Sequence, residues 1–229
     1  PMAVMQERLA QIVGSTSKEI IAPFSIITPD AQEYGIPDLS TIEGQERIEK
    51  LITDETKLIV MDNISTLIRS GKENEGESWL PVQEWCLRLR SRGKTVLFIH
   101  HSGKGGQQRG SSRREDVLDT VIVLKKPADY KQENGACFEV HFEKNRGLYG
   151  DDVKPFEVHL ASNTSVDGKN NFTWTWKSLD DSNFEKVCRL KNEGMTQSEI
   201  VEELKINKST VSRYVNRGKQ ELKINMQNV

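Results

Sequence analysis

A short apolar run that ends in a carboxylate constrains the fold of this chain more than any other stretch. Residues 58–61 are apolar, contain no turn-forming residue, and are followed directly by Asp62 and Asn63. Such a run is typical of a buried parallel strand, and ligands of open α/β sheets gather at the carboxyl ends of the strands. An aspartate there can hold Mg²⁺, which bridges nucleotide phosphates. The alternative is that the last residue of the strand only caps a following helix.

Further patterns predict strands and helices on either side of this run. Residues 24–28 are rich in strand formers, and a capping-box signature at Ser40 opens a helix that leads toward Asp62. Residues 79–89 carry a helical apolar stripe whose tryptophans we assign to packing. Residues 95–100 form a second apolar strand that ends in polar side chains. The order predicts an α/β fold with a doubly wound, mostly parallel sheet.

The next part of the chain predicts strands separated by turns instead of long helices. The expected strands are residues 120–124, 138–143, 155–160 and 172–177. We therefore expect antiparallel hairpins at one edge of the sheet. The predicted organisation is a core domain over residues 1–177, a linker over 178–182 and a small all-helical domain over 183–229.

Charge and cysteine content limit the classes of protein. The net charge is −2, but residues 183–229 contain nine Lys and Arg against six Glu, which favours contact with an anion. The three cysteines are far apart and lack metal-ligand spacing, so we expect reduced thiols and a cytoplasmic location. No membrane-spanning run or signal peptide is recognisable, so no membrane contact is expected. Because the chain opens with Pro1 inside a helical pattern, we expect a fragment of a longer protein.

The sequence contains no P-loop. Residues 93–95 read Gly-Lys-Thr, but the residue five positions before the glycine is Arg88, and the segment lies between a helix and a strand instead of the reverse. Residues 103–105 read Gly-Lys-Gly and lack the required hydroxyl. A phosphate-binding loop, if the intact protein has one, is therefore expected upstream of Pro1.

Two pairs of polar side chains follow predicted strands. His100 and His101 are adjacent on an extended segment and point to opposite faces, which disfavours a shared zinc ion. One of them can sense a γ-phosphate, or it can satisfy a loop carbonyl. Lys144 and Arg146 are two residues apart, so alternation predicts a shared face from which they could reach a neighbouring subunit's nucleotide. A solvated sheet edge would have the same spacing.

In combination, these features resemble a known family. Asp62 after an apolar strand is similar to a Walker B motif. Residues 100–104, followed by residues 109–112, resemble the sensor strand and loop of RecA-like ATPases of the plasmid RepA type. Residues 144–150 resemble the Lys-x-Arg finger of hexameric DnaB-like helicases, and the whole resemblance covers residues 1–160.

The resemblance implies roles for particular residues. Asp62 would hold Mg²⁺ and ATP with Asn63 beside it, and His101 would be the sensor. Lys144 and Arg146 would act on the nucleotide of a neighbouring subunit in a homo-oligomeric ring, as in a hexamer. The loop residues that would face the central channel and DNA are Lys104, Gln107, Gln108, Arg109 and Arg113. The family's Walker A lysine and catalytic glutamate would fall just before this sequence, so the polypeptide alone is expected not to hydrolyse ATP.

Residues 183–222 have the pattern of three short helices. The first apolar face ends at Gly194, a capping box at Thr196 opens the second helix, and Asn207 caps the third. This plan resembles the helix-turn-helix tails of resolvases and sigma-like regulators. The expected DNA contacts are Ser209, Thr210, Ser212, Arg213, Asn216 and Arg217. A helical bundle for subunit contacts is the alternative.

The combined prediction is an ATP-dependent DNA-handling protein, a RepA-type replicative helicase or replication ATPase. A rival from another class is a non-enzymatic DNA-binding regulator that uses a RecA-like scaffold for oligomerisation. A third is a KaiC-like ATPase that acts on proteins.

Overall fold

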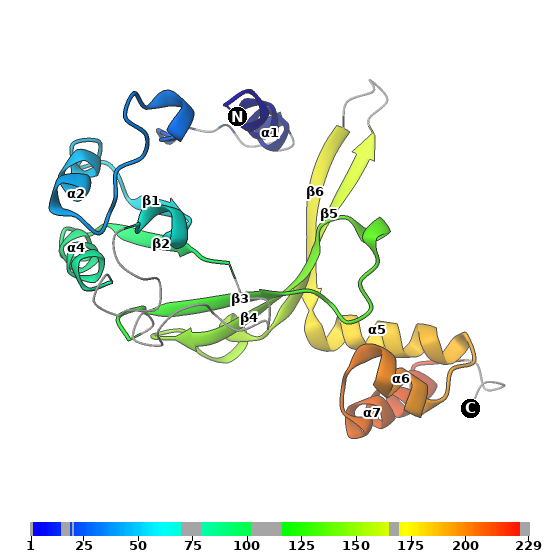
Figure 1. Cartoon of the computed structure of the whole chain (residues 1–229). Coiled ribbons are helices and arrows are strands. Elements are labelled where there is room, and N and C mark those ends of the chain that lie inside the picture. Colours follow the sequence, from blue (N-terminus) through cyan, green and yellow to red (C-terminus); the bar gives the residue numbers. More distant parts are fainter. Residues whose placement is uncertain are drawn as a thin grey trace. The chain divides into compact units, whose positions relative to one another are not determined.

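The computed structural model describes a mixed α/β chain with one parallel and one antiparallel sheet (Figure 1). The described residues are 2–14, 19, 21–69, 79–101, 116–164 and 170–224. Contacts divide the chain between Leu118 and Asp119, which places residues 21–118 in a first unit and residues 119–229 in a second. The N-terminal helix α1 (Met2–Gly14) is divided between the two and has no buried residue.

The first unit is built around two parallel strands. Strand β1 (Leu58–Asp62) pairs with β2 (Thr95–Ile99), and their last residues lie opposite each other. Helix α4 (Leu80–Ser91) precedes β2 and contacts it. The other elements of this unit are η1 (Pro29–Ala31), α2 (Ile42–Glu49) and α3 (Ile64–Leu67). The predicted parallel pairing of these two strands is confirmed.

Buried side chains hold α2 and α4 against one face of the strand pair. The indole N–H of Trp85, which is fully buried, donates to the Glu49 carboxylate at 2.7 Å. Trp79 packs edge-on against Phe98, with ring centroids 5.3 Å apart. The buried amide of Gln45 donates to the carbonyl oxygen of Leu39 at 2.9 Å. Both tryptophans therefore have packing roles, as the sequence predicts.

The opposite face of the strand pair is exposed. Leu58, Val60 and Leu97 are 55%, 53% and 45% exposed, whereas Met61 on the covered face is 4% exposed. Parallel strands are normally covered on both faces. Within the described residues, only one face of β1 and β2 is covered.

The second unit contains a four-stranded antiparallel sheet in the order β3-β4-β5-β6. The strands are β3 (Thr120–Lys125), β4 (Cys137–Asn145), β5 (Phe156–Thr164) and β6 (Asn170–Ser178). Short 3-10 turns occur between strands at η3 (Gln132–Asn134) and η4 (Gly150–Val153). The predicted antiparallel strands are confirmed. They form a sheet of their own, so the expectation of one mostly parallel sheet with antiparallel edges is wrong for the described residues.

Side-chain alternation gives this antiparallel sheet an apolar face and a polar face. Val158 on β5 lies opposite Phe138 on β4 and Trp176 on β6. The flanking residues Glu157 and His159 point to the other face of the sheet. This polar face packs against the first turns of α5 (Leu179–Asn192), the helix that directly follows β6.

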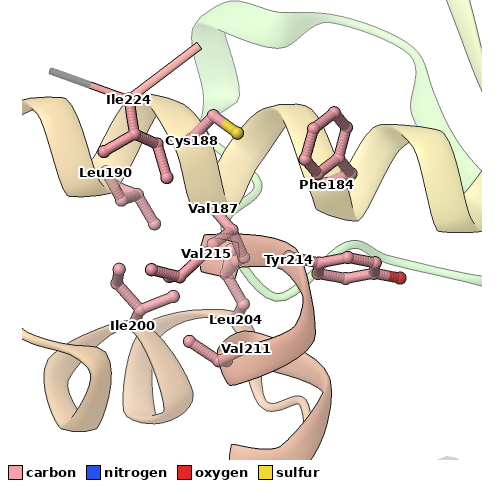
Figure 2. Packing of buried hydrophobic residues seen from close by; sticks show 10 residues of the cluster. All are labelled: Phe184, Val187, Cys188, Leu190, Ile200, Leu204, Val211, Tyr214, Val215 and Ile224. Atoms are coloured by element: carbon pink, nitrogen blue, oxygen red, sulfur yellow. The ribbon is translucent and has the colours of Figure 1, made fainter. Parts of the chain in front are cut away.

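Three helices complete the second unit. They are α5 (Leu179–Asn192), α6 (Gln197–Leu204) and α7 (Lys208–Gln220), which confirms the predicted three-helix pattern. Figure 2 shows the aliphatic and aromatic side chains that they enclose, among them Phe184, Val187, Ile200, Val211 and Val215. Each of these five side chains is at most 1% exposed. The three-helix region therefore has a closed core of its own.

Close packing in the three-helix region requires a glycine at position 218. A Cβ added to Gly218 would lie 2.7 Å from Ile224 Cδ1 and 2.8 Å from Cys188 Sγ. Neither distance is compatible with an ordinary carbon contact. The absence of a side chain at position 218 therefore leaves room for Ile224 to pack beside Cys188.

Two predictions in the first unit differ from the structure. Residues 24–28 are not a strand, although Phe24 and its neighbours favour one, because no described strand pairs with them. Phe24 is 71% exposed. Helix α2 is capped one residue later than expected: the hydroxyl of Thr41, not Ser40, accepts from the Gly44 N–H at 3.1 Å.

Residues 178–182, which the sequence predicts as a linker, are the last residue of β6 and the first residues of α5. Ser178 is both the last residue of β6 and the N-cap of α5, and its hydroxyl accepts from the Asp181 N–H at 3.1 Å. The segment looks like a linker because it is polar, but polar residues at a helix start satisfy exposed backbone N–H groups. No helix among the described residues is both long and apolar enough to cross a membrane.

Candidate functional sites

Asp62 lies where the sequence predicts, at the carboxyl end of a parallel strand. It is the last residue of β1, pairs with Ile99 in β2, and is exposed. Within the described residues, no hydrogen bond or ion pair engages its carboxylate. An exposed carboxylate at this edge is chemically suited to a hydrated Mg²⁺ ion.

Asn63, not Asp62, caps the following helix. The Asn63 side-chain oxygen accepts from the Thr66 N–H at 3.1 Å, and the Thr66 hydroxyl accepts from the Asn63 N–H at 3.3 Å. Together they form a capping box for α3. The capping alternative for Asp62 is therefore excluded, whereas the oxygen of Asn63, predicted at the nucleotide site, already has a structural role.

His101 lies two residues beyond the end of β2 and is exposed, while His100 is half-buried. Because β1 and β2 end in register, both histidines follow the same strand edge as Asp62. The structure thus brings the predicted sensor and the predicted metal ligand to one edge. The predicted loop contacts Lys104, Gln107, Gln108, Arg109 and Arg113 lie outside the described residues.

Lys144 and Arg146 belong to the second unit. Lys144 lies in β4 opposite Val121, next to a bulge in the pairing with β3. Arg146 follows the last residue of β4, and its backbone N–H donates to the Asp119 carbonyl at 2.8 Å. Its guanidinium lies 3.9 Å from the Asp119 carboxylate and is 55% exposed. The strand ends between these two residues, so strand alternation does not place them on one face.

The predicted DNA contacts on α7 separate into two sets. Ser209 and Asn216 are exposed, and Thr210 and Ser212 are half-buried. Arg213 and Arg217 are instead paired with acids in the first turn of α5. In their observed positions, the two arginines are therefore engaged by carboxylates, whereas the exposed Ser209 and Asn216 are more available to a ligand.

Asp180, in the first turn of α5, contacts three side chains of α7. Its carboxylate accepts from Arg213 at 3.1 Å and from the Tyr214 hydroxyl at 2.6 Å, and it lies 3.8 Å from Arg217. The Arg217 guanidinium also lies over the Phe184 ring, 4.1 Å from its centroid. Burial and the hydrogen bond to Asp180 raise the pKa of Tyr214. These contacts fix the start of α5 against α7.

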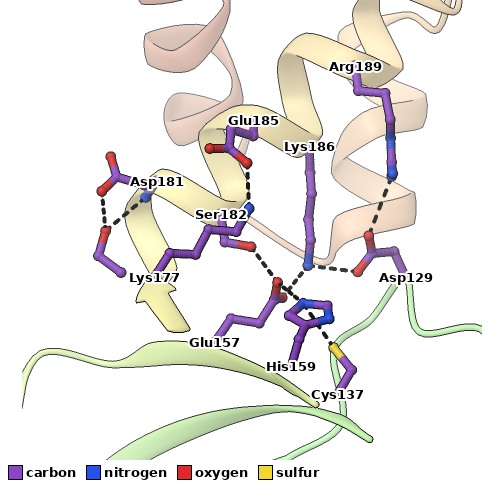
Figure 3. Close-up of polar contacts among 11 residues, drawn as sticks. Asp129, Cys137, Glu157, His159, Lys177, Asp181, Ser182, Glu185, Lys186 and Arg189 are labelled. Carbon is purple, nitrogen blue, oxygen red and sulfur yellow. Dashed lines mark hydrogen bonds and ion pairs between the residues drawn. The ribbon is translucent and has the colours of Figure 1, made fainter. Parts of the chain in front are cut away.

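A second cluster of chemically active side chains lies on the polar face of the antiparallel sheet (Figure 3). Cys137 on β4 lies opposite His159 on β5, with Cys137 Sγ 3.4 Å from His159 Nε2. His159 Nε2 is 2.9 Å from Glu157 Oε1. Cys137 is 7% exposed and Glu157 is 1% exposed. The three groups offer one sulfur, one nitrogen and one oxygen ligand atom, all within 4.8 Å of one another.

Helix α5 supplies the partners of Glu157. Lys186 Nζ lies 2.5 Å from Glu157 Oε2 and 2.9 Å from Asp129 Oδ1, and the Ser182 hydroxyl donates to Glu157 Oε1 at 2.8 Å. Burial alone would raise the pKa of Glu157, but hydrogen bonds from Lys186, His159 and Ser182 outweigh burial and lower it to about 2. Burial and the nearby Glu157 carboxylate raise the pKa of Cys137. Glu157 is therefore ionised and Cys137 is a thiol at neutral pH.

Sequence reasoning missed this cluster because its members meet across strands. Cys137 and His159 are 22 positions apart, and their contact depends on the register of β4 and β5. One local signal was available: Glu157 and His159 are two residues apart in a predicted strand, which places both on one face.

Comparisons of the chain with protein-family models, curated proteins and solved structures found no match. The resemblance to RecA-like ATPases and to helix-turn-helix tails therefore stays a hypothesis.

Proposed function

We propose that this chain belongs to an ATP-dependent DNA-handling protein of the RecA-like, RepA type and contributes to it a metal-binding carboxylate and a helix-turn-helix. The observation that carries the proposal is the exposed Asp62 carboxylate at the carboxyl end of β1, parallel to β2. Open α/β sheets bind ligands at this edge. The neighbouring Asn63 satisfies the following helix, so Asp62 is left for a ligand.

In the proposed site, Asp62 holds Mg²⁺ and His101 responds to the γ-phosphate from the adjacent strand end. Both residues follow strands that end in register. A carboxylate usually holds Mg²⁺ through bound water, and the ion bridges nucleotide phosphates. A nucleotide site also needs a phosphate-binding loop, which the 229 residues do not contain. Hydrolysis is therefore proposed for an assembly that supplies this loop, with Lys144 and Arg146 acting on a neighbouring subunit in a homo-oligomeric ring.

Mn²⁺, a paramagnetic substitute for Mg²⁺, tests the metal site without requiring hydrolysis. With ATP present, Mn²⁺ should broaden the NMR resonances of residues at the end of β1 and the start of α3. The variant Asp62→Asn should abolish this broadening. The matched variant Asp54→Asn removes an exposed carboxylate from the turn before β1 and should leave the broadening intact. Equal broadening in Asp62→Asn and the unmodified chain would rule out the proposed ligand.

For DNA, the proposed reading element is α7. The short helix α6, the turn after it and the longer helix α7 follow the helix-turn-helix plan. Ser209 and Asn216 are exposed on α7. Asparagine can contact adenine through two hydrogen bonds, and hydroxyls can contact bases or phosphates. The partial positive charge at the N-terminus of α7 also favours phosphate there.

Fluorescence anisotropy with labelled duplex and single-stranded DNA tests this surface. We expect binding that weakens steeply as salt is raised, because phosphate contacts release counterions. Asn216→Ala should weaken binding to a preferred site by about 1–3 kcal/mol. Asn134→Ala, an exposed asparagine outside the three helices, should leave affinity unchanged. Affinity that is insensitive to salt and to Asn216→Ala would contradict the assignment.

The alternative function is a DNA-binding regulator without enzymatic activity. The closed core of α5, α6 and α7 favours this alternative, because these helices pack without any contribution from the strand edge that carries Asp62. The two functions differ in one measurement. Duplex binding that is unchanged by ATP, Mg²⁺ and Asp62→Asn supports the regulator, whereas nucleotide-dependent DNA binding supports the ATPase.

A further inference from the structure

We propose that Cys137, Glu157 and His159 form a binding site for Zn²⁺ on the polar face of the antiparallel sheet. The site is independent of the proposed function, because it lies in the second unit and shares no residue with the edge at Asp62. Thiolate and imidazole ligands suit Zn²⁺, whereas Mg²⁺ prefers oxygen ligands alone. The two proposed metal sites therefore select different ions.

The ligand atoms have nearly the separations that a tetrahedral zinc ion needs. With typical zinc–ligand bond lengths, sulfur and nitrogen ligands lie about 3.6 Å apart and nitrogen and oxygen ligands about 3.3 Å apart. Cys137 Sγ and His159 Nε2 are 3.4 Å apart, and His159 Nε2 and Glu157 Oε1 are 2.9 Å apart. These two separations are within about half an ångström of the tetrahedral values, and all three ligand atoms lie within 4.8 Å of one another.

The backbone and the solvent access of the site also fit a metal centre. Cys137 and His159 are directly opposite each other in neighbouring strands, so the sheet fixes two ligands from the start. A cavity of about 430 Å³ lies beside all three ligands and provides an entry path. Three protein ligands leave the fourth position of a tetrahedral zinc ion for water or a small anion.

The groups around Glu157 match the outer contacts of metal ligands. Ligating carboxylates are usually held by further hydrogen bonds. Glu157 Oε2 is held by Lys186, while Oε1 faces His159 and receives the Ser182 hydroxyl (Figure 3). The charge of Lys186 is shared with Asp129 at 2.9 Å, so the ammonium group is balanced by two carboxylates. Glu157 can therefore bind an ion through Oε1 and keep its contact with α5 through Oε2.

Binding of the ion requires the loss of one proton. Zinc binds the thiolate, so the thiol proton must be released when the Zn–S bond forms. The competing explanation is a hydrogen-bonded cluster that only fastens α5 to the sheet.

Co²⁺ distinguishes these two explanations, because a thiolate ligand gives it a charge-transfer absorption band. We expect the 229-residue chain to bind one Co²⁺ with such a band, and Zn²⁺ to displace it. Cys137→Ser should abolish the band, and His159→Ala should weaken binding at least tenfold. Cys86→Ser removes a cysteine from the other unit and should leave the band intact. A folded chain without the band, or a band that persists in Cys137→Ser, overturns the proposal.

A second measurement uses the unmodified chain and does not depend on how the variants fold. Zn²⁺ should shift the imidazole nitrogen resonances of His159 far more than those of His141. His141 is a matched reference, because it lies 2.8 Å from Glu139 and has the same two-residue spacing from its glutamate. Equal or absent shifts at the two histidines contradict the zinc site.

Discussion

The three-helix region and the parallel strand pair differ in how completely they bury their apolar side chains. In the helices, Phe184, Ile200 and Val211 are at most 1% exposed, and the core is closed by neighbours that are close in sequence. In the strand pair, one face is covered by α4, whereas Val60 and Leu97 on the other are about half exposed. Within the described residues, the core of the three helices is closed on all sides, whereas the strand pair is covered on one face only. Stability should therefore depend on core packing in the helices far more than on the outer face of β1.

The largest effect should come from the core of the three helices. Phe184→Ala removes a buried ring that packs against Tyr214 at 5.9 Å between centroids, and should lower the free energy of unfolding by about 3–5 kcal/mol. Val60→Ala, on the uncovered face of β1, should change it by less than about 0.5 kcal/mol. Urea denaturation of the whole chain, followed by circular dichroism, checks both variants, because Phe184 lies in the second unit and Val60 in the first. A large effect of Val60→Ala would show that its face is buried in solution.

Acidification should produce the next largest effect, at the junction of α5 with the sheet. The ordinary pKa of Glu157 is 4.5 and the folded value is about 2. A carboxyl with a depressed pKa adds stability above its unfolded pKa, and this stability is lost as pH falls toward the folded pKa. The shift corresponds to about 3 kcal/mol, lost between about pH 4.5 and pH 2.

Urea denaturation across this pH range measures the loss. Glu157→Gln should be less stable than the unmodified chain at pH 7 but should lack this component of the acid dependence. Glu139→Gln alters a neighbouring carboxylate that hydrogen-bonds a histidine at 2.8 Å, and should retain the component. Identical acid dependence in all three proteins would contradict the assigned role of Glu157.

Overpacking should have an intermediate effect. Gly218→Ala places a methyl group 2.7 Å from Ile224 and 2.8 Å from Cys188, and should destabilise the second unit by about 1–3 kcal/mol. Gly14→Ala in α1 is the control, because nothing lies within 4 Å of its added methyl group. It should be neutral or slightly stabilising. Thermal unfolding of the two variants distinguishes close packing from the general effect of replacing a helical glycine.

The smallest effect should come from a helix cap. The Thr196 hydroxyl accepts from the Glu199 N–H, and the Thr196 backbone N–H donates to the Glu199 carboxylate at 2.7 Å. Thr196→Ala should destabilise the three-helix region by about 1 kcal/mol, and Thr196→Ser, which keeps the hydroxyl, should restore most of it. Urea denaturation measures both. Equal losses in the two variants would show that the methyl group of Thr196, not its hydroxyl, provides the stabilisation.

Local patterns in the sequence predicted much of the fold. The alternating and apolar runs placed β1, β2 and the four antiparallel strands, and the capping box at Thr196 placed the start of α6. These predictions succeeded because each depends on a few adjacent residues. The prediction of a strand over residues 24–28 was wrong, because strand-forming residues make a strand only where a partner strand is present.

Side-chain partners were not predictable in the same way. Arg213 and Arg217 have the spacing of a DNA-reading face, yet both lie near Asp180, more than 30 positions earlier in the chain. The meeting of Cys137 with His159 likewise depends on strand register. At Asp62 the sequence supplied the correct position, but only the structure showed that Asn63 takes the capping role.

The junction at Ser178 has a mechanical consequence. Because this residue ends β6 and caps α5, no freely rotating spacer separates sheet from helix. Ser182 and Lys186 anchor the same helix to Glu157 of β5 one and two turns later. A movement of α7 and α5 is therefore transmitted to the strands. A ligand bound by these helices has a fixed orientation relative to the sheet.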